Sequence, residues 1–148
     1  MTAWHVAQVN IARLLQPVES PKTQEFISLL DPVNALADAA PGFVWRLSAT
    51  SSMEPTGADP MIVVNLSVWE SIEHLEAFVR VPAHAAVMRR RREWFERMAE
   101  AYMALWWVPA GTVPTEEDAF ERIELIRAQG PTEKAFTFRQ RFPAPAPL

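Results

Sequence analysis

The chain of 148 residues contains no cysteine, which excludes disulfide bonds, thiolate metal ligands and cysteine nucleophiles. Only four glycines are present, and the chain has neither a glycine-rich phosphate-binding loop nor a serine nucleophile elbow. The three histidines, His5, His74 and His84, do not show the spacing of metal ligands. We therefore expect no metal site.

An excess of positive charge is absent too. The formal net charge is −4, the wrong sign for a general nucleic-acid binder. No export signal opens the chain, and the most apolar run, "AYMALWWVPAG" at 101–111, is too short to span a bilayer. Apolar residues make up 49% of the chain, which favours an ordered globular fold. We expect a cytoplasmic protein that binds neither nucleic acid nor membrane.

Hydrophobic periodicity predicts alternating strands and helices. Strands are expected at 5–15, 43–50, 61–69, 101–111 and 135–142, and helices at 22–40, 71–98 and 115–130. The first six elements follow the order β-α-β-β-α-β, which predicts an α+β, ferredoxin-like fold with a helix and a strand added at the C-terminus. This domain covers 1–142, and a proline-rich tail covers 143–148.

Local signals refine the helices. Pro32 follows Asp31, which predicts a break within 22–40. Pro82 predicts a kink within 71–98. Thr115 and Asp118 have the spacing of a capping box, so the last helix should begin there.

Alternation in the first three strands separates an apolar face from a mixed face. The mixed face is expected to carry Gln8, Asn10, Arg46, Ser48, Asn65, Ser67 and Trp69. A face open to water would more often carry lysine, glutamate and threonine. Amides and a tryptophan instead indicate a sheltered surface, which is either a ligand pocket or a subunit interface.

Four consecutive arginines, 89–92, lie within the expected helix 71–98 and point in different directions because successive residues turn by about 100°. Arg89 and Arg92 each have a glutamate four residues later, Glu93 and Glu96, which predicts solvated pairs. Arg90 is intermediate between a solvated and an inward-facing residue, because Glu93 follows it at three residues and Trp94 at four. Arg91 has apolar neighbours at helical spacing, which predicts that its side chain turns inward.

Arg91 shares a helical stripe with His84, Met88 and Phe95. The arginine either reaches the rim or a core carboxylate for structural reasons, or it meets a ligand. His84 is likewise either a neutral hydrogen-bonding group or a ligand contact.

Four segments together resemble a known family: "PGFVWRL", "NLSVWES", "HAAVMRRRREWF", and "LWWVPAG" followed by "GPTEKAFTF". The chain is similar over nearly its whole length to a bacterial family described only as a domain of unknown function. That family is grouped with the antibiotic-biosynthesis monooxygenase-like, dimeric α+β barrel proteins. The resemblance implies a homodimer in which two ferredoxin-like subunits pack sheet against sheet.

Some quinone-forming monooxygenases of that superfamily use an asparagine and a tryptophan four residues apart on a strand, with an arginine on the next helix. Asn65 and Trp69 match this spacing, and Arg89–Arg91 lie where the arginine is expected. Those enzymes also carry a tyrosine soon after the tryptophan, whereas this chain reads "ESIEHLEAF" there.

Three hypotheses follow. The first is a cofactor-independent, monooxygenase-like enzyme for a small aromatic or polyketide-like molecule, with His84 as general base and Asn65 and Arg91 stabilising an oxygen anion. Its further substrate contacts would be Trp69, Trp94, Asn10, Arg46 and Trp107. Tyr102 either joins this pocket or packs in the core beside the tryptophans, and we expect core packing. The second is a haem protein with His84 as axial ligand. The third is a non-catalytic ligand-binding dimer.

Overall fold

The computed structural model describes residues 3–47 and 61–146. Four antiparallel strands form one sheet in the order β2-β3-β1-β4. The strands are β1 Trp4–Arg13, β2 Phe43–Arg46, β3 Ile62–Trp69 and β4 Met103–Pro109. The helices are α1 Pro21–Asp38, α3 Ile72–Val79, α4 Pro82–Arg89 and α5 Glu116–Gln129, with a 3-10 turn, η1, at Arg91–Glu93. The predicted α+β, ferredoxin-like fold is confirmed.

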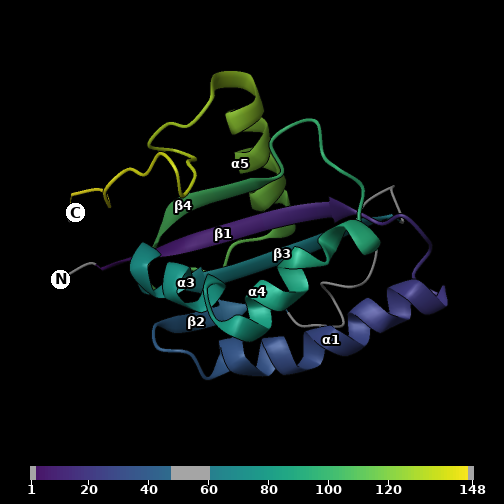
Figure 1. Cartoon of the computed structure of the whole chain (residues 1–148). Coiled ribbons are helices and arrows are strands. Elements are labelled where there is room, and N and C mark those ends of the chain that lie inside the picture. Colours follow the sequence, from purple (N-terminus) through teal and green to yellow (C-terminus); the bar gives the residue numbers. More distant parts are fainter. Residues whose placement is uncertain (1–2, 48–60, 147–148) are drawn as a thin grey trace.

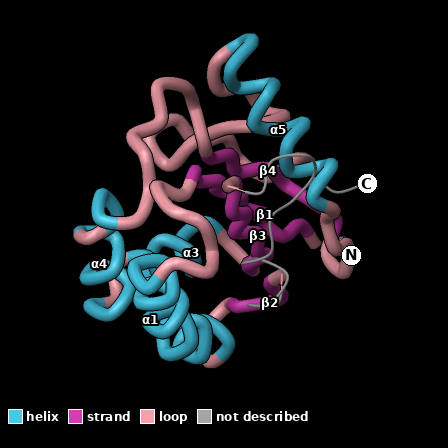
Figure 2. Tube along the Cα trace, turned by 90° about the vertical axis from the view of Figure 1, so that its right-hand side faces the viewer, coloured by secondary structure: helices cyan, strands magenta, loops and turns pink. Residues whose placement is uncertain are grey.

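Helices cover both faces of the sheet. Helix α5 lies on one side, and α1, α3 and α4 lie on the other (Figures 1 and 2). The apolar face packs on α5 through a core of Ala7, Val9, Ile11, Val64, Leu66, Val68, Ala104, Trp106, Val108, Ala119, Ile123 and Ile126. The opposite face of β1 and β3 carries the predicted amides, so the alternation predicted for these two strands is confirmed.

Strand β2 departs from simple alternation. Its register with β3 shifts between Phe43 and Trp45, so Phe43 pairs with Trp69 while Arg46 pairs with Ser67. The extra residue in this bulge brings Phe43 and Arg46 to the same face. Simple alternation in the sequence predicts that Phe43 and Trp45 share the apolar face, and this prediction is wrong for Phe43. Ser48 lies outside the described residues.

Two helix predictions need correction. Helix α1 continues through Pro32 without a break. Pro32 has no N–H to donate to the carbonyl of Ser28, four residues earlier. Both residues are exposed, so water can donate a hydrogen bond to that carbonyl instead. The expected helix 71–98 is interrupted more than predicted: α3 ends at Val79, α4 starts at Pro82, and the chain turns into η1 after Arg89.

The C-terminal segment contains helix α5 but not the predicted strand at 135–142. The capping box between Thr115 and Asp118 is present. After α5, only isolated bridges connect Phe136 with Leu105 and Thr132 with Ala135. Phe136 is fully buried and exchanges two backbone hydrogen bonds of 2.8 Å with Leu105, so burial and one bridge fix it rather than a continuous ladder. Within the described parts of the chain, no helix is both long and apolar enough to cross a lipid bilayer.

Candidate functional site

A cavity of about 370 Å³ lies between the mixed face of the sheet and the layer of α1, α3, α4 and η1. Its wall is mostly aliphatic and aromatic, as is usual for small-molecule pockets. The polar wall residues are Gln8, Asn10, Asn34, Arg46, Asn65, Ser67, His84, Arg91 and Tyr102. Within residues 3–47 and 61–146, no aspartate or glutamate lines it, although the protein as a whole is acidic.

A chain of hydrogen bonds fixes the polar groups on the sheet. Gln8 Nε2 donates to Asn65 Oδ1 at 2.7 Å and to Ser67 Oγ at 2.8 Å. Asn10 Nδ2 donates to Gln8 Oε1 at 3.3 Å, and Trp69 Nε1 donates to Ser67 Oγ at 3.0 Å. The register places these residues opposite one another on β1 and β3, so the backbone ladder determines the arrangement.

This chain leaves hydrogen-bond donors unused. The Ser67 oxygen accepts two N–H groups, and no acceptor for its hydroxyl hydrogen lies among the described residues. The side-chain oxygen of Asn65 accepts a hydrogen bond from Gln8, and no acceptor for the Asn65 NH₂ group lies among the described residues. Both side chains line the cavity, so these donors are available to an acceptor on a ligand.

Aromatic rings form the wall next to these donors. Trp69 is buried, and its indole meets Phe43 edge-on at 5.4 Å and stacks with Phe78 at 5.2 Å. Phe78 in turn meets the imidazole of His84 edge-on at 5.3 Å. A flat ring entering the cavity would find an aromatic surface beside hydrogen-bond donors.

His84 lies on α4 and lines the same cavity as Asn65. Burial lowers the pKa of His84 below its ordinary value of 6.5, and the backbone of Val79 opposes this shift only in part. The imidazole is therefore neutral at neutral pH, the form that accepts a proton.

Arg91 turns into the cavity from η1. Its Nη1 donates to the hydroxyl of Tyr102 at 3.1 Å, and its guanidinium carbon lies 5.9 Å from the centre of that ring. Among the described residues, no carboxylate forms an ion pair with Arg91. His84, Met88, Arg91 and Phe95 all line the cavity, as the stripe predicted, even though the α-helix does not continue to Arg91.

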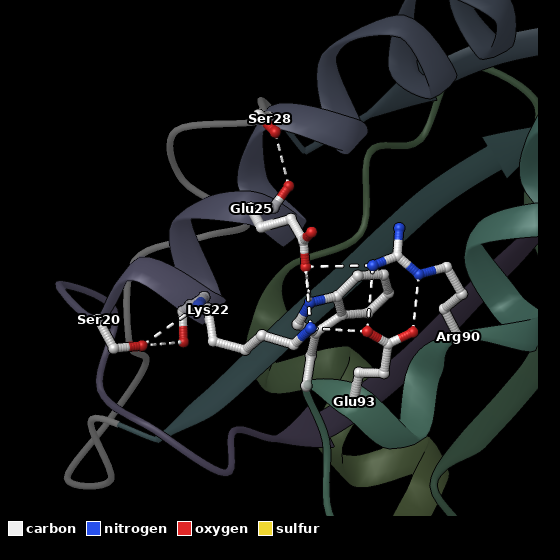
Figure 3. Close-up of polar contacts among 8 residues, drawn as sticks. Ser20, Lys22, Glu25, Ser28, Arg90 and Glu93 are labelled. Carbon is white, nitrogen blue, oxygen red and sulfur yellow. Dashed lines mark hydrogen bonds and ion pairs between the residues drawn. The ribbon is translucent and has the colours of Figure 1, made fainter.

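The neighbouring arginine holds this turn in place. Arg90 pairs with Glu93 at 2.7 Å and with Glu25 of α1 at 3.2 Å, while Lys22 binds both glutamates (Figure 3). The guanidinium of Arg90 also lies over the Trp94 ring at 4.8 Å. The network joins η1 to α1 and so fixes the backbone from which the next residue, Arg91, reaches the cavity.

The predicted pairs of Arg89 with Glu93 and of Arg92 with Glu96 do not form. Glu93 binds Arg90, and Glu96 lies near Arg13 at 3.7 Å. Because α4 ends at Arg89, residues four apart beyond this point no longer share a helix face.

Three predicted substrate contacts have other partners. Arg46 lines the cavity, but Asp38 binds its Nε and Nη2 at 2.8 and 3.2 Å and neutralises its charge. Trp94 and Trp107 do not line the cavity, contrary to prediction. Trp94 packs on Phe26 with Nε1 toward Glu25, and Trp107 donates to the carbonyl of Phe142.

Tyr102 lines the cavity and accepts a hydrogen bond from Arg91, and it also packs against the apolar core that α5 covers. Both roles considered for Tyr102 are therefore present. Tyr102 precedes β4, and its backbone carbonyl accepts a hydrogen bond from the N–H of Ile11 at 2.9 Å. The cavity brings together five residues that the sequence predicts to share one site: Asn10, Asn65, Trp69, His84 and Arg91.

Haem ligation by His84 stays a prediction. A metal-bound histidine ordinarily donates its second ring N–H to a carboxylate, a carbonyl or water. Nδ1 of His84 is buried and has no hydrogen-bond partner in the described part of the protein. Those same residues also contain no cluster of three metal-ligating side chains.

Residues 5–147 match the family model described as a domain of unknown function, DUF3291. The chain belongs to this family. The resemblance seen in the sequence motifs is thereby confirmed. No curated protein matches the chain.

Solved structures similar to this DUF3291 chain share its fold. SnoaB, a cofactor-independent oxygenase from Streptomyces nogalater, is 19% identical with a TM-score of 0.51, over 76% of this chain and 100% of SnoaB. A candidate antibiotic biosynthesis monooxygenase from Caulobacter crescentus CB15 is 14% identical with a TM-score of 0.55, over 74% of this chain and 92% of that protein. A conserved protein from Methanosarcina mazei Go1 is 14% identical with a TM-score of 0.53, over 70% of this chain and 90% of that protein. At these identities the similarity establishes the fold alone.

Proposed function

We propose that the protein binds a small aromatic or polyketide-like molecule in this cavity and oxygenates it without a cofactor. The supporting observation is that His84, Asn65 and Arg91 line one cavity with an aromatic wall. The name of SnoaB, a cofactor-independent oxygenase of the same fold, agrees with this reaction class.

In the proposed reaction, neutral His84 removes a proton from an enolisable carbon of the substrate. The amide of Asn65 and the positive charge of Arg91 stabilise the resulting oxygen anion. The electron-rich carbanion reduces dioxygen and forms a carbon–oxygen bond, and protonated His84 returns its proton to the resulting peroxide anion to give a hydroperoxide. Loss of water from the hydroperoxide then leaves a carbonyl, so that one dioxygen molecule yields one new carbonyl oxygen and one water.

The test is oxygen uptake with anthrone as probe, measured together with the appearance of anthraquinone. His84→Ala should reduce turnover at least about 100-fold, the contribution expected of a general base. Arg89→Ala is the matched control, because Arg89 is exposed on the same helix and has no partner among the described residues. Full turnover by the His84 variant, with an unchanged circular dichroism spectrum, would refute the proposed role. Binding without oxygen uptake by the wild type would favour a non-catalytic ligand carrier.

We further propose a homodimer, which the family resemblance implies, but with a contact different from the packing of sheet against sheet expected from that resemblance. Helix α5 already covers the apolar face over β1, β3 and β4, whereas Trp45 and Leu47 at the β2 edge of this face are only partly buried. A second subunit would therefore contact the β2 edge. Light scattering should give twice the mass of one chain, and Trp45→Glu should return the mass to that of a monomer.

A further inference from the structure

The guanidinium of Arg91 stands out among the charged groups of the cavity. It is half-buried, and the neutral hydroxyl of Tyr102 is its hydrogen-bond partner. The other arginine of the wall, Arg46, is neutralised by Asp38. Since no carboxylate of the described residues lines the cavity, Arg91 brings a positive charge that these residues do not balance.

An unpaired cation held away from water is costly, and proteins normally place an acceptor beside it. A substrate that becomes anionic only during the reaction would leave this cation unbalanced while the substrate is bound. A carboxylate, with an ordinary pKa near 4, is already charged at neutral pH. The planar fork of arginine also matches a carboxylate in two parallel hydrogen bonds.

Tyr102 complements this arginine. Its oxygen accepts a hydrogen bond from Arg91, which polarises the hydroxyl and strengthens it as a donor. No acceptor for that hydroxyl hydrogen lies among the described residues, and the ring lines the cavity. Arginine and tyrosine thus present N–H and O–H donors side by side.

We propose that the ligand of this cavity carries a carboxylate, and that Arg91 and Tyr102 bind it together. This inference rests on the proposal that the cavity accepts an aromatic molecule and adds the acid group to its substrate class. With its N–H groups bound to the carboxylate, Arg91 stabilises the oxygen anion of the reaction only through its charge, and the free amide hydrogens of Asn65 bond that oxygen directly.

Calorimetric titration of the full chain with 2-naphthoic acid and with its neutral analogue 2-naphthamide tests the proposal. The acid should bind at least about tenfold more tightly than the amide, the advantage expected of charge-assisted hydrogen bonds. Arg91→Gln should abolish this preference without weakening the amide, Arg91→Lys should retain part of it, and Tyr102→Phe should reduce it several-fold. Arg92→Gln, the exposed neighbour, is the matched control and should leave both affinities unchanged.

Equal affinity for acid and amide, or binding of neither compound, would overturn the proposal. Equal losses in the Arg91→Gln and Arg92→Gln variants would overturn it too, because a general charge effect would then explain the preference. Selective acid binding without oxygen uptake on anthrone or on an anthrone carboxylic acid would refute the proposed oxygenase and leave the carboxylate site standing. Circular dichroism of each variant separates lost binding from lost folding.

Discussion

The indole nitrogen of Trp69 donates a hydrogen bond to the hydroxyl oxygen of Ser67, two residues earlier on the same strand, at 3.0 Å. Both side chains are buried on the cavity face, and Gln8 donates to the same oxygen from β1. One hydroxyl therefore satisfies donors from two strands. This makes Ser67 a structural centre of the cavity floor.

Replacing Ser67 by alanine should destabilise the protein by about 1–3 kcal/mol, because the indole N–H of Trp69 is then buried without an acceptor. Urea unfolding followed by circular dichroism measures this change. Ser28→Ala is the control, since the Ser28 hydroxyl bonds only a carbonyl of its own exposed helix turn. It should cost less than about 0.5 kcal/mol. Equal losses in both variants would contradict the structural role of Ser67.

His84 should make stability depend on pH near neutrality. Burial lowers the pKa of His84 in the folded protein below the ordinary 6.5, so the unfolded chain binds the proton more tightly. The free energy of unfolding of the wild type should therefore fall, relative to His84→Gln, as the pH drops below 6.5. Denaturant titrations between pH 8 and 5 measure the difference, and a constant difference would show that His84 is not buried as a neutral ring.

Gly42→Ala should be more damaging than Gly111→Ala. Both glycines have positive φ, +81° and +91°, so each substitution carries a backbone cost of about 1–2 kcal/mol. A Cβ at position 42 would also lie within 2.2–2.6 Å of three atoms of the His74 side chain, whereas one at 111 meets nothing within 4 Å. Thermal unfolding should rank the two variants in this order. The reverse ranking would argue against the close approach of His74.

The network that joins η1 to α1 should weaken in acid. Hydrogen bonds from Arg90 and Lys22 lower the pKa of Glu93 to about 2 from 4.5, and Lys22 lowers that of Glu25. Because these values are depressed on folding, the stabilisation is complete above pH 4.5 and is lost as the pH falls toward 2. The Tm advantage of the wild type over Glu93→Gln should shrink across this range. Glu121→Gln, an exposed change with no ion pair among the described residues, should show no such trend.

Residue order alone was enough to predict the order of the main strands and helices and which side chains of β1 and β3 share a face. This is because the side-chain period of a strand is two residues and the helical period is 3.6. Alternation therefore brought Gln8, Asn10, Asn65 and Trp69 to one surface. Apolar neighbours at helical spacing likewise indicated that Arg91 turns inward.

Other features were decided by contacts between segments far apart in the sequence. The bulge that moves Phe43 depends on pairing with β3, and Phe136 is fixed by burial against the rest of the fold rather than in a strand. Glu93 pairs with Arg90 and Lys22 only because η1 meets α1. Tyr102, just before β4, meets Arg91 at the cavity because η1 packs near the start of that strand. Local periodicity fixes which way a side chain points within its own element, but the partner it meets there depends on how distant elements pack.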